Sequence, residues 1–186
     1  TSDNGAGDYS LAEPEFFEAN APLRGYKGSL YEGGIRVPAI ASWPGRIQAG
    51  STSDHPWYFA DLMPTFAELA GVHDTVPRDA DALSFVPALI GEAAAGRPQE
   101  APEAIYWEIW EEPLQRAVRM GDWKAVWRSP EAPVELYDLS RDVGEKNDVA
   151  DEHPDLVRRM RRYMERQHED PPPQIEPGAR DARYYR

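Results

Sequence analysis

The sequence contains no cysteine, and this absence removes several kinds of chemistry at once. Disulfide bridges, thiolate nucleophiles and thiolate zinc sites are all excluded within these 186 residues. The compartment stays open, because many secreted bacterial proteins also lack disulfides; periplasmic, secreted and cytoplasmic locations all remain compatible with the sequence. No stretch approaches the roughly 20 apolar residues that a membrane-spanning helix needs, and no charged-then-apolar leader opens the chain. We therefore expect no membrane span.

Basic side chains are also scarce relative to acidic ones. The 33 acidic residues outnumber the 20 lysines and arginines, which gives a net charge of −13. A protein of this charge repels nucleic acid and anionic membranes unless one face is locally basic, so nucleic acid is not expected as a partner. The hydrophobic content of 41% is enough to fill the core of one domain, or of one domain with a small appendage.

Composition shifts divide the chain into four parts. Residues 1–75 carry glycine-rich segments, an apolar run and a helical pattern, and residues 76–103 are interpreted as a linker. Residues 104–170 change to aromatic, alternating segments typical of a second unit. Residues 171–186 are proline-rich and lack periodicity, so we expect an extended tail.

In the first part, an apolar run is followed by a helical pattern. The β-branched run at residues 35–43 ends at a Pro-Gly pair, which predicts a mostly buried strand that ends in a turn. Asp61 is placed to cap a helix that ends before Gly71. The expected apolar face of this helix consists of Leu62, Phe66 and Leu69. A strand followed by a helix indicates the α/β class for this part.

The third part predicts a small antiparallel sheet covered by one helix. Strand-like patterns occur in four segments, at residues 104–110, 115–120, 123–127 and 134–139. Gly121 and Asp122, between the second and third segments, fit a two-residue hairpin turn. After Pro154, apolar residues recur at helical spacing with arginines on the other side. The sequence thus predicts an α+β subdomain in which four antiparallel strands pack against a C-terminal helix.

Two segments near the start carry the residues that are best suited to bind a ligand. Asp3 and Asn4 are adjacent oxygen ligands of the kind that hard divalent cations prefer. Residues 23–38 hold Lys27 between glycines, where the backbone can approach a ligand closely and the lysine offers a compact positive charge. A metal-type pair of ligands combined with a lysine is typical of a site for a bound oxyanion.

These segments and several others resemble the C-terminal portion of a formylglycine-dependent sulfatase of the alkaline phosphatase superfamily. The motifs that carry the resemblance lie at residues 1–5, 23–38, 43–45, 61–65, 69–71, 81–84, 117–119, 121–124 and 136–139. The resemblance implies that residues 1–75 are the C-terminal part of the large sulfatase α/β domain. It also implies that residues 104–170 are the small C-terminal α+β subdomain of that fold.

The resemblance implies roles for three residues. In this family the aspartate and asparagine of the first motif bind a divalent metal, so Asp3 and Asn4 are expected to be ligands, with calcium as the expected ion. They provide at most three oxygens, whereas calcium takes six to eight. The resemblance places two further aspartates in an N-terminal part of the protein. Lys27 is expected to contact a sulfate oxygen and to stabilise charge as the ester bond breaks.

The nucleophile of this family is a formylglycine made from cysteine, or less often serine, in a Cys/Ser-x-Pro-x-Arg motif. Ser42 matches the serine form with Pro44 and Arg46, but the leucine-threonine-glycine continuation is absent. Ser42 is therefore interpreted as a strand-end residue. The resemblance implies that the nucleophile lies in the N-terminal part of the same protein, and that these 186 residues alone are inactive.

The remaining polar residues are interpreted as structural. Arg24, Glu32 and Arg36 are expected to support the lysine segment. Glu32 would pair with Arg36 in a helix, but Gly33 and Gly34 argue against a helix, so such pairing would have to come from the fold. The 4 histidines show no metal-ligand spacing.

Two alternatives to a sulfatase stay open at the level of sequence. A phosphonate or phosphate-ester hydrolase of the same superfamily would use the same residues, because these residues bind a tetrahedral oxyanion whether its central atom is sulfur or phosphorus. A degenerate sulfatase-like module would keep the fold without the activity. The sulfatase hypothesis implies a small-molecule or glycan sulfate ester as substrate.

Overall fold

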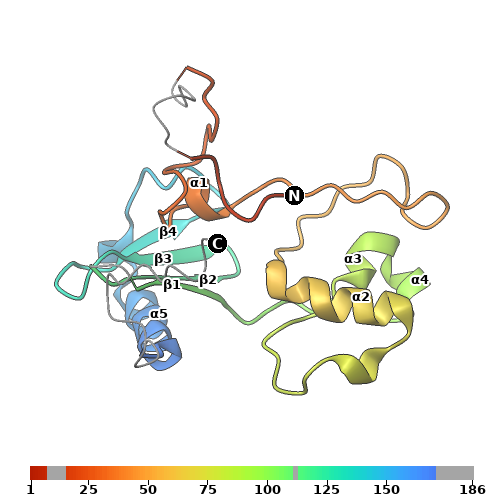
Figure 1. Ribbon diagram of the computed structural model, residues 1–186. Helices are drawn as coiled ribbons and strands as arrows, with labels where there is room; N and C mark the ends of the chain where they lie inside the picture. The colour runs from red at the N-terminus through yellow and green to blue at the C-terminus, as the bar shows by residue number, and fades with distance from the viewer. Residues whose placement is uncertain (8–15, 111–112, 171–186) are drawn as a thin grey trace, which may run out of the picture. The chain divides into compact units, whose positions relative to one another are not determined.

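The computed structural model describes residues 1–7, 16–110 and 113–170. The chain divides into two compact units, a helical unit of Thr1 and Pro38–Glu103 and a sheet unit of Ser2–Val37 and Ala104–Arg186 (Figure 1). Both glycine-rich segments thus belong to the same unit as the C-terminal sheet, although the sequence grouped them with residues up to 75. The predicted extended tail lies outside the described residues.

Four antiparallel strands in the order β1-β2-β3-β4 form the sheet. They are β1 (Ile105–Ile109), β2 (Gln115–Met120), β3 (Trp123–Trp127) and β4 (Glu135–Asp138). A tight turn at Gly121 and Asp122 joins β2 to β3, with Met120 opposite Trp123 and Gly121 at a φ of 60°. The predicted α/β class, the four strands and this hairpin are confirmed.

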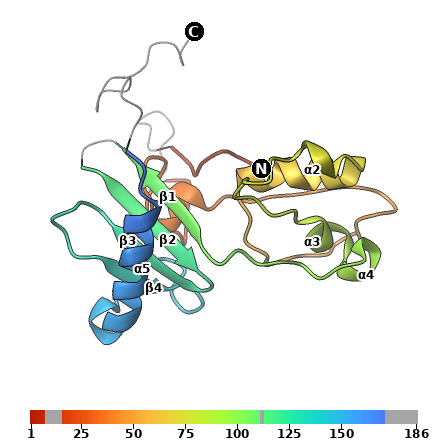
Figure 2. The ribbon, with the colours of Figure 1, turned by 90° about the horizontal axis from the view of Figure 1, so that it is seen from below.

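One face of the sheet is covered by α5 (Pro154–Gln167), as predicted (Figure 2). A short 3-10 turn, η3 (Ala150–Glu152), leads into it. Met160 and Met164 of α5 are fully buried and pack against Val118 and Leu136 of the strands. Among the described residues, no helix is both long and apolar enough to cross a membrane.

The opposite face of the sheet is covered by the lysine segment, which contains α1 (Glu32–Ile35). Leu30 is buried there against Val126 and Tyr137. The expectation that Gly33 and Gly34 exclude a helix is wrong, because tertiary contacts outweigh the low helix propensity of glycine. Successive residues of a strand point to opposite faces, so the sheet has an α5 face and an α1 face.

The helical unit contains only short elements. They are η1 (Phe59–Asp61), α2 (Leu62–Ala70), η2 (His73–Thr75), α3 (Val86–Ile90) and α4 (Glu92–Ala95). The predicted helix after Asp61 is α2, and Gly71 ends it in a left-handed conformation with a φ of 71°. The segment interpreted as a linker, residues 76–103, contains α3 and α4.

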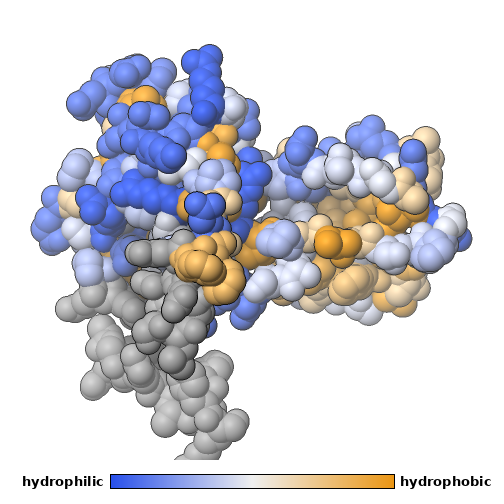
Figure 3. All heavy atoms as spheres, turned by 90° about the horizontal axis from the view of Figure 1, so that it is seen from above, coloured by the Kyte–Doolittle hydropathy of each residue, from blue (hydrophilic) through white to orange (hydrophobic). Residues whose placement is uncertain are grey.

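The buried face of α2 differs from the predicted one. Thr65 and Ala67 are its buried residues, whereas Phe66 is 60% exposed. The buried hydroxyl of Thr65 is satisfied, because it donates to Asp61 O (2.6 Å) and accepts the N–H of Phe85 (3.1 Å). Figure 3 shows apolar side chains on the surface of this unit. Phe66, which the helical spacing predicts to be buried, thus lies at the surface of α2.

The predicted strand at residues 35–43 is wrong for this chain. Ile35 ends α1, and residues 36–43 have no regular structure. Ile40 is 92% exposed. A strand needs a neighbour for its backbone hydrogen bonds, and the described residues provide no partner strand to this segment.

Candidate functional site

Two backbone hydrogen bonds join the N-terminal segment to the lysine segment. The N–H of Gly5 donates to Gly34 O (2.9 Å), and the N–H of Lys27 donates to Ala6 O (2.9 Å). The two segments that stand out in the sequence therefore lie side by side within one unit.

Glycine is required where these segments meet, because the backbones approach too closely for a side chain. A Cβ on Gly5 would lie 1.8 Å from Gly33 O of the lysine segment. Within the lysine segment itself, a Cβ on Gly34 would lie 2.1 Å from Ser29 O. Contacts this short force backbone atoms to move. Gly5 thus allows the two segments to pack closely, and Gly34 allows the lysine segment to fold back on itself.

Asn20 links the two segments through its side-chain amide. Its Oδ1 accepts the N–H of Ala6 (3.2 Å), and its Nδ2 donates to Gly25 O (2.8 Å). Sequence reasoning missed this residue, because a single asparagine before Ala-Pro resembles an ordinary turn residue.

The three predicted site residues are accessible to a ligand. Asp3 and Lys27 are exposed, and Asn4 is half-buried. Asn4 Nδ2 donates to Asp3 Oδ1 (3.1 Å), which keeps these two side chains together. Within the described part of the chain, no hydrogen bond or ion pair engages the Lys27 ammonium. A cation of this kind can bind an anionic oxygen directly.

The donor set of Asp3 and Asn4 fits part of a site for a hard divalent cation. Carboxylate and amide oxygens are the ligands that calcium prefers. Across residues 1–7, 16–110 and 113–170, no group of three or more His, Asp or Glu side chains could hold a metal ion. A metal at Asp3 and Asn4 would therefore need further ligands from elsewhere.

A buried charge cluster lies between the lysine segment and the sheet. Lys124 of β3 is fully buried, and its Nζ donates to Glu32 Oε1 of α1 (2.9 Å). The same Nζ lies 2.9 Å from Glu145 Oε1, an ion pair without hydrogen-bond geometry. At the solvent edge, Arg36 Nη1 lies 3.5 Å from Glu32 Oε2. The fold thus creates the Glu32–Arg36 pair that the sequence left open, and two positive groups balance two carboxylates.

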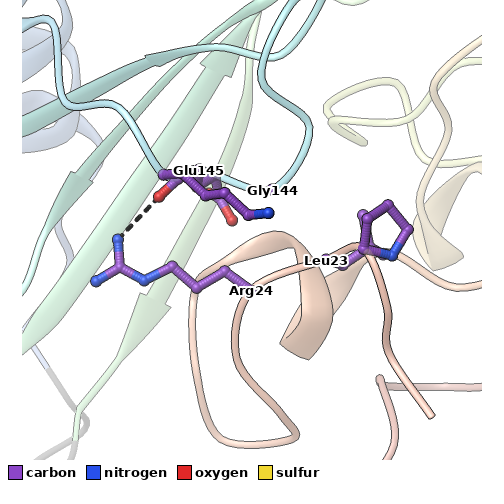
Figure 4. Close-up of a pocket in the computed structure, with 6 residues that line it drawn as sticks. Leu23, Arg24, Gly144 and Glu145 are labelled. Carbon is purple, nitrogen blue, oxygen red and sulfur yellow. Dashed lines mark hydrogen bonds between the residues drawn. The ribbon is translucent and has the colours of Figure 1, made fainter. Parts of the chain in front are cut away.

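Glu145 connects this cluster to the start of α1. Its Oε2 accepts the N–H of Glu32, the first residue of α1 (2.6 Å). Its backbone O accepts a hydrogen bond from Arg24 Nη1 (3.1 Å; Figure 4). Burial raises the pKa of Glu145 above its usual value, although the neighbouring Lys124 ammonium opposes this shift.

A second polar group attaches the lysine segment to β4. The hydroxyls of Tyr31 and Tyr137 both donate to Glu135 Oε2, at 2.6 and 2.7 Å. The Arg24 guanidinium lies 3.8 Å from the centre of the Tyr31 ring and donates to the Tyr137 hydroxyl (2.9 Å). Burial and the hydrogen bonds to Glu135 raise the pKa of both tyrosines, so both hydroxyls stay protonated at neutral pH.

Two open grooves adjoin the lysine segment. The first, of about 460 Å³, is lined by Pro22, Leu23, Arg24, Gly144, Glu145 and Lys146 (Figure 4). The second, of about 410 Å³, reaches Gly25 and Tyr26. Asp3, Asn4 and Lys27 line neither of these two grooves.

Ser42, which matches the serine form of the nucleophile motif, lies in the helical unit. Its segment is exposed and irregular, so the expected strand-end position is not found. The following turn is closed by Trp43 O, which accepts the N–H groups of Arg46 and Ile47 at 2.9 Å. Ser42 and Lys27 thus belong to different units.

Comparison of the chain with known protein families identifies the class of protein to which this fold and these two joined segments belong. Residues 26–170 match the family described as N-sulphoglucosamine sulphohydrolase, C-terminal. The chain therefore belongs to this family of sulfatase C-terminal regions. The resemblance drawn from its motifs is confirmed.

The curated relatives are sulfatases. An uncharacterized sulfatase of Schizosaccharomyces pombe is 37% identical over 153 residues, which cover 78% of this chain and 27% of the relative. The N-acetylgalactosamine-6-sulfatase of Canis lupus familiaris is 41% identical over 98 residues, 53% of this chain and 18% of the relative. The N-acetylgalactosamine-6-O-sulfatase of Bacteroides thetaiotaomicron is 30% identical over 188 residues, 89% of this chain and 35% of the relative. The chain thus spans about a third or less of the length of these relatives.

Solved structures share the fold. The crystal structure of Ps i-CgsB matches with a TM-score of 0.70 and 34% identity, covering 89% of this chain and 34% of that protein. A protein in complex with its substrate, D-glucosamine-2-N, 6-O-disulfate, matches with a TM-score of 0.60 and 28% identity, covering 74% of this chain and 29% of that protein.

Proposed function

We propose that this chain forms one wall of a sulfatase active site and that the intact protein hydrolyses sulfate esters. The observation that supports this most strongly is the direct hydrogen bonding between the segment of Asp3 and Asn4 and the segment of Lys27. It occurs in a chain that belongs to a sulfatase family. The metal-type ligands Asp3 and Asn4 and the exposed Lys27 ammonium thus lie in two adjacent, hydrogen-bonded backbone segments.

Each of the three residues has a defined part in this proposal. Asp3 and Asn4 hold a divalent cation, calcium, together with ligands from elsewhere in the protein. A cation at this position would neutralise negative charge on the sulfate oxygens and activate the nucleophile. Lys27 donates to a sulfate oxygen and stabilises the charge that develops as the S–O ester bond breaks.

We further propose that the nucleophile is a formylglycine in the N-terminal part of the same protein. This sequence has no cysteine from which a formylglycine could be made. Ser42 lacks the rest of the modification signal. The 186 residues alone are accordingly expected to be inactive.

The N-terminal part is also the proposed structural partner of the helical unit. Phe59, Met63 and Phe66 are exposed on η1 and α2, and Ile40 is 92% exposed in a segment with the composition of a buried strand. Apolar side chains that gather on the surface of one unit are typical of an interface (Figure 3). A neighbouring strand from the N-terminal part would satisfy the backbone of residues 36–43.

The proposed substrate is a sulfated glycan. Two of the relatives are named as sulfatases of N-acetylgalactosamine, and one similar structure holds a disulfated glucosamine. Exposed Asp3 and Lys27 are suited to the end of a glycan that enters from solvent.

The test measures sulfate release from a sulfated hexosamine by the full-length protein, with a matched phosphate ester as competitor substrate. Chelation should abolish release, calcium should restore it, and Asp3→Ala should raise the calcium concentration required by about tenfold or more. The exposed Asp54→Ala is the control and should leave this requirement unchanged. Faster phosphate release would indicate a phosphatase, and no release from either ester would indicate a degenerate module. Either result would contradict the proposal.

A further inference from the structure

The unusual feature of the sheet is that its most buried long side chain is charged. Lys124 is fully buried on the α1 face of β3, and the two carboxylates beside it are almost as inaccessible: Glu32 is 2% exposed and Glu145 is 0% exposed. Taking three charges out of water is costly, and well-packed apolar residues of the same size would often be at least as stabilising. Stability alone therefore explains this cluster poorly.

The cluster fixes the position of α1 from two directions. Lys124 Nζ holds the Glu32 side chain at 2.9 Å, while Glu145 Oε2 holds the Glu32 backbone N–H at 2.6 Å. Side chain and main chain of one residue are thus attached to β3 and to the loop after β4. This arrangement determines both the place and the rotation of the first turn of α1.

From α1 the contacts lead directly to both parts of the candidate site. The N–H of Gly33 donates to Arg24 O (2.7 Å), which closes the loop that carries Lys27. The carbonyl O of Gly34 accepts the N–H of Gly5 (2.9 Å), which holds the segment of Asp3 and Asn4. One helical turn thus positions the metal-type ligands and the lysine together.

Apolar packing already attaches the lysine segment to the sheet without the cluster. Leu30 is buried on the α1 face, and Ile35 packs beside it. Apolar contacts are non-directional, whereas a buried hydrogen-bonded charge pair accepts only a narrow range of geometries. The charges therefore add direction to an attachment that the apolar residues already supply.

We propose that Lys124 is a positioning residue for the sulfatase site, acting through Glu32 and Glu145 to fix α1 and thereby the relative positions of Asp3, Asn4 and Lys27. The inference rests on the proposed function for its effect on catalysis. Its effect on the two segments is independent of any activity. Lys124 does not itself touch substrate.

The test uses Lys124→Met in the full-length protein, with Met160→Ala as the matched control. Met160 is equally buried but lies on the α5 face, so its truncation destabilises the same sheet without touching the cluster. With both proteins fully folded at the assay temperature, Lys124→Met should lower kcat by about 10-fold to 100-fold, because small displacements of reacting groups cost this much. Met160→Ala should leave kcat within about twofold of the unchanged protein.

A second readout does not depend on activity. Hydrogen exchange at the amides of Gly5, Lys27 and Gly33 should become at least about tenfold faster in Lys124→Met than in Met160→Ala, because these amides donate bonds that hold the two segments and α1 together. If the unchanged protein releases no sulfate, the proposed function fails and exchange alone still tests the positioning.

A variant without charges separates positioning from stabilisation. Lys124→Met combined with Glu32→Gln and Glu145→Gln leaves no unpaired buried charge, so thermal stability should recover relative to Lys124→Met alone. On our proposal kcat and amide exchange do not recover with it. Recovery of kcat and of amide exchange in the triple variant would show that the cluster only stabilises the fold. Equal kcat and equal amide exchange in Lys124→Met and Met160→Ala would show the same, and either result would overturn the inference.

Discussion

At the scale of single residues, Glu145 joins the buried charge cluster to the start of α1 and to Arg24. Its carboxylate accepts a hydrogen bond from the N–H of Glu32 and forms an ion pair with Lys124. Its backbone O accepts a hydrogen bond from Arg24 Nη1. It also adopts a φ of 50°, in the left-handed region that non-glycine residues rarely occupy. A residue held in this conformation, buried and ionisable, should show its role in a pH titration.

Glu145→Gln should change the pH dependence of stability in a defined direction. Burial raises the pKa of Glu145 above its ordinary value of 4.5, so the folded state holds the proton more tightly than the unfolded state. The stability due to this group is fully present below pH 4.5 and is lost as the pH rises through the folded-state value. The unfolding free energy of the unchanged protein relative to Glu145→Gln should therefore increase as the pH falls toward 4.5.

Denaturant titrations of both proteins at a series of pH values measure this difference. Exposed Glu165→Gln, at a residue that pairs with Arg161 one turn away on α5, is the control and should show no comparable increase. A difference that shrinks as the pH falls would mean that the Lys124 ammonium outweighs burial at Glu145.

The residues that we propose to carry chemical roles were easier to single out from the sequence than the residues that hold them. Asp3, Asn4 and Lys27 stand out because local motifs mark them, and their segments are adjacent in the structure. The support from Glu145 and Lys124 joins positions 92 to 113 residues apart in the chain. No local spacing can indicate contacts of that kind, although a lysine in an apolar strand is a usable signal.

At the scale of elements, prediction succeeded where an element finds its partners within the chain. The four strands and α5 bury their apolar residues against one another, so their patterns were sufficient. The segment at residues 36–43 has no such partner and forms no strand. For α1, a capping carboxylate from Glu145 replaces the helix propensity that Gly33 and Gly34 lack.

In the helical unit, Asp61 links two elements in the way that Glu145 links α1 to β3 in the sheet unit. Its side chain accepts the N–H groups of Tyr58 (3.1 Å) and Leu83 (2.7 Å), and so links the start of α2 to the segment before α3. Asp61→Ala should destabilise this unit by about 2–3 kcal/mol, because two donors lose their acceptor. Hydrogen exchange of the α2 amides measures the loss locally.

The control for this prediction is Asp54→Ala, at an exposed position earlier in the same unit. It should change the exchange of the α2 amides by no more than about 0.5 kcal/mol. Equal effects of the two substitutions would contradict the role of Asp61 as the link within the unit.

At the scale of the whole molecule, most of the large exposed apolar side chains in the described residues lie in the helical unit. The sheet unit has buried clusters on both faces. The helical unit leaves Ile40, Phe59, Met63 and Phe66 exposed. The 186 residues should therefore associate with themselves or with the proposed N-terminal part through the helical unit.

Phe66→Glu should reduce self-association of the 186-residue chain, because it places a charge in the apolar surface of α2. Light scattering over a concentration series measures the change. Arg162→Glu, at an exposed helical position on α5, is the control and should leave self-association unchanged. Equal scattering by Phe66→Glu and the unchanged chain would show that this surface is not an interface.

The central claim is that Lys27 binds the group being transferred in a sulfatase site, and one kinetic measurement tests it most directly. Sulfate release from a sulfated hexosamine is compared between the full-length protein and its Lys27→Ala and Lys146→Ala variants, both at exposed lysines of the sheet unit. Loss of one preorganised donor to the developing charge should lower kcat of Lys27→Ala by about 100-fold to 1,000-fold, with Lys146→Ala unchanged. An unaltered kcat in Lys27→Ala would contradict the account.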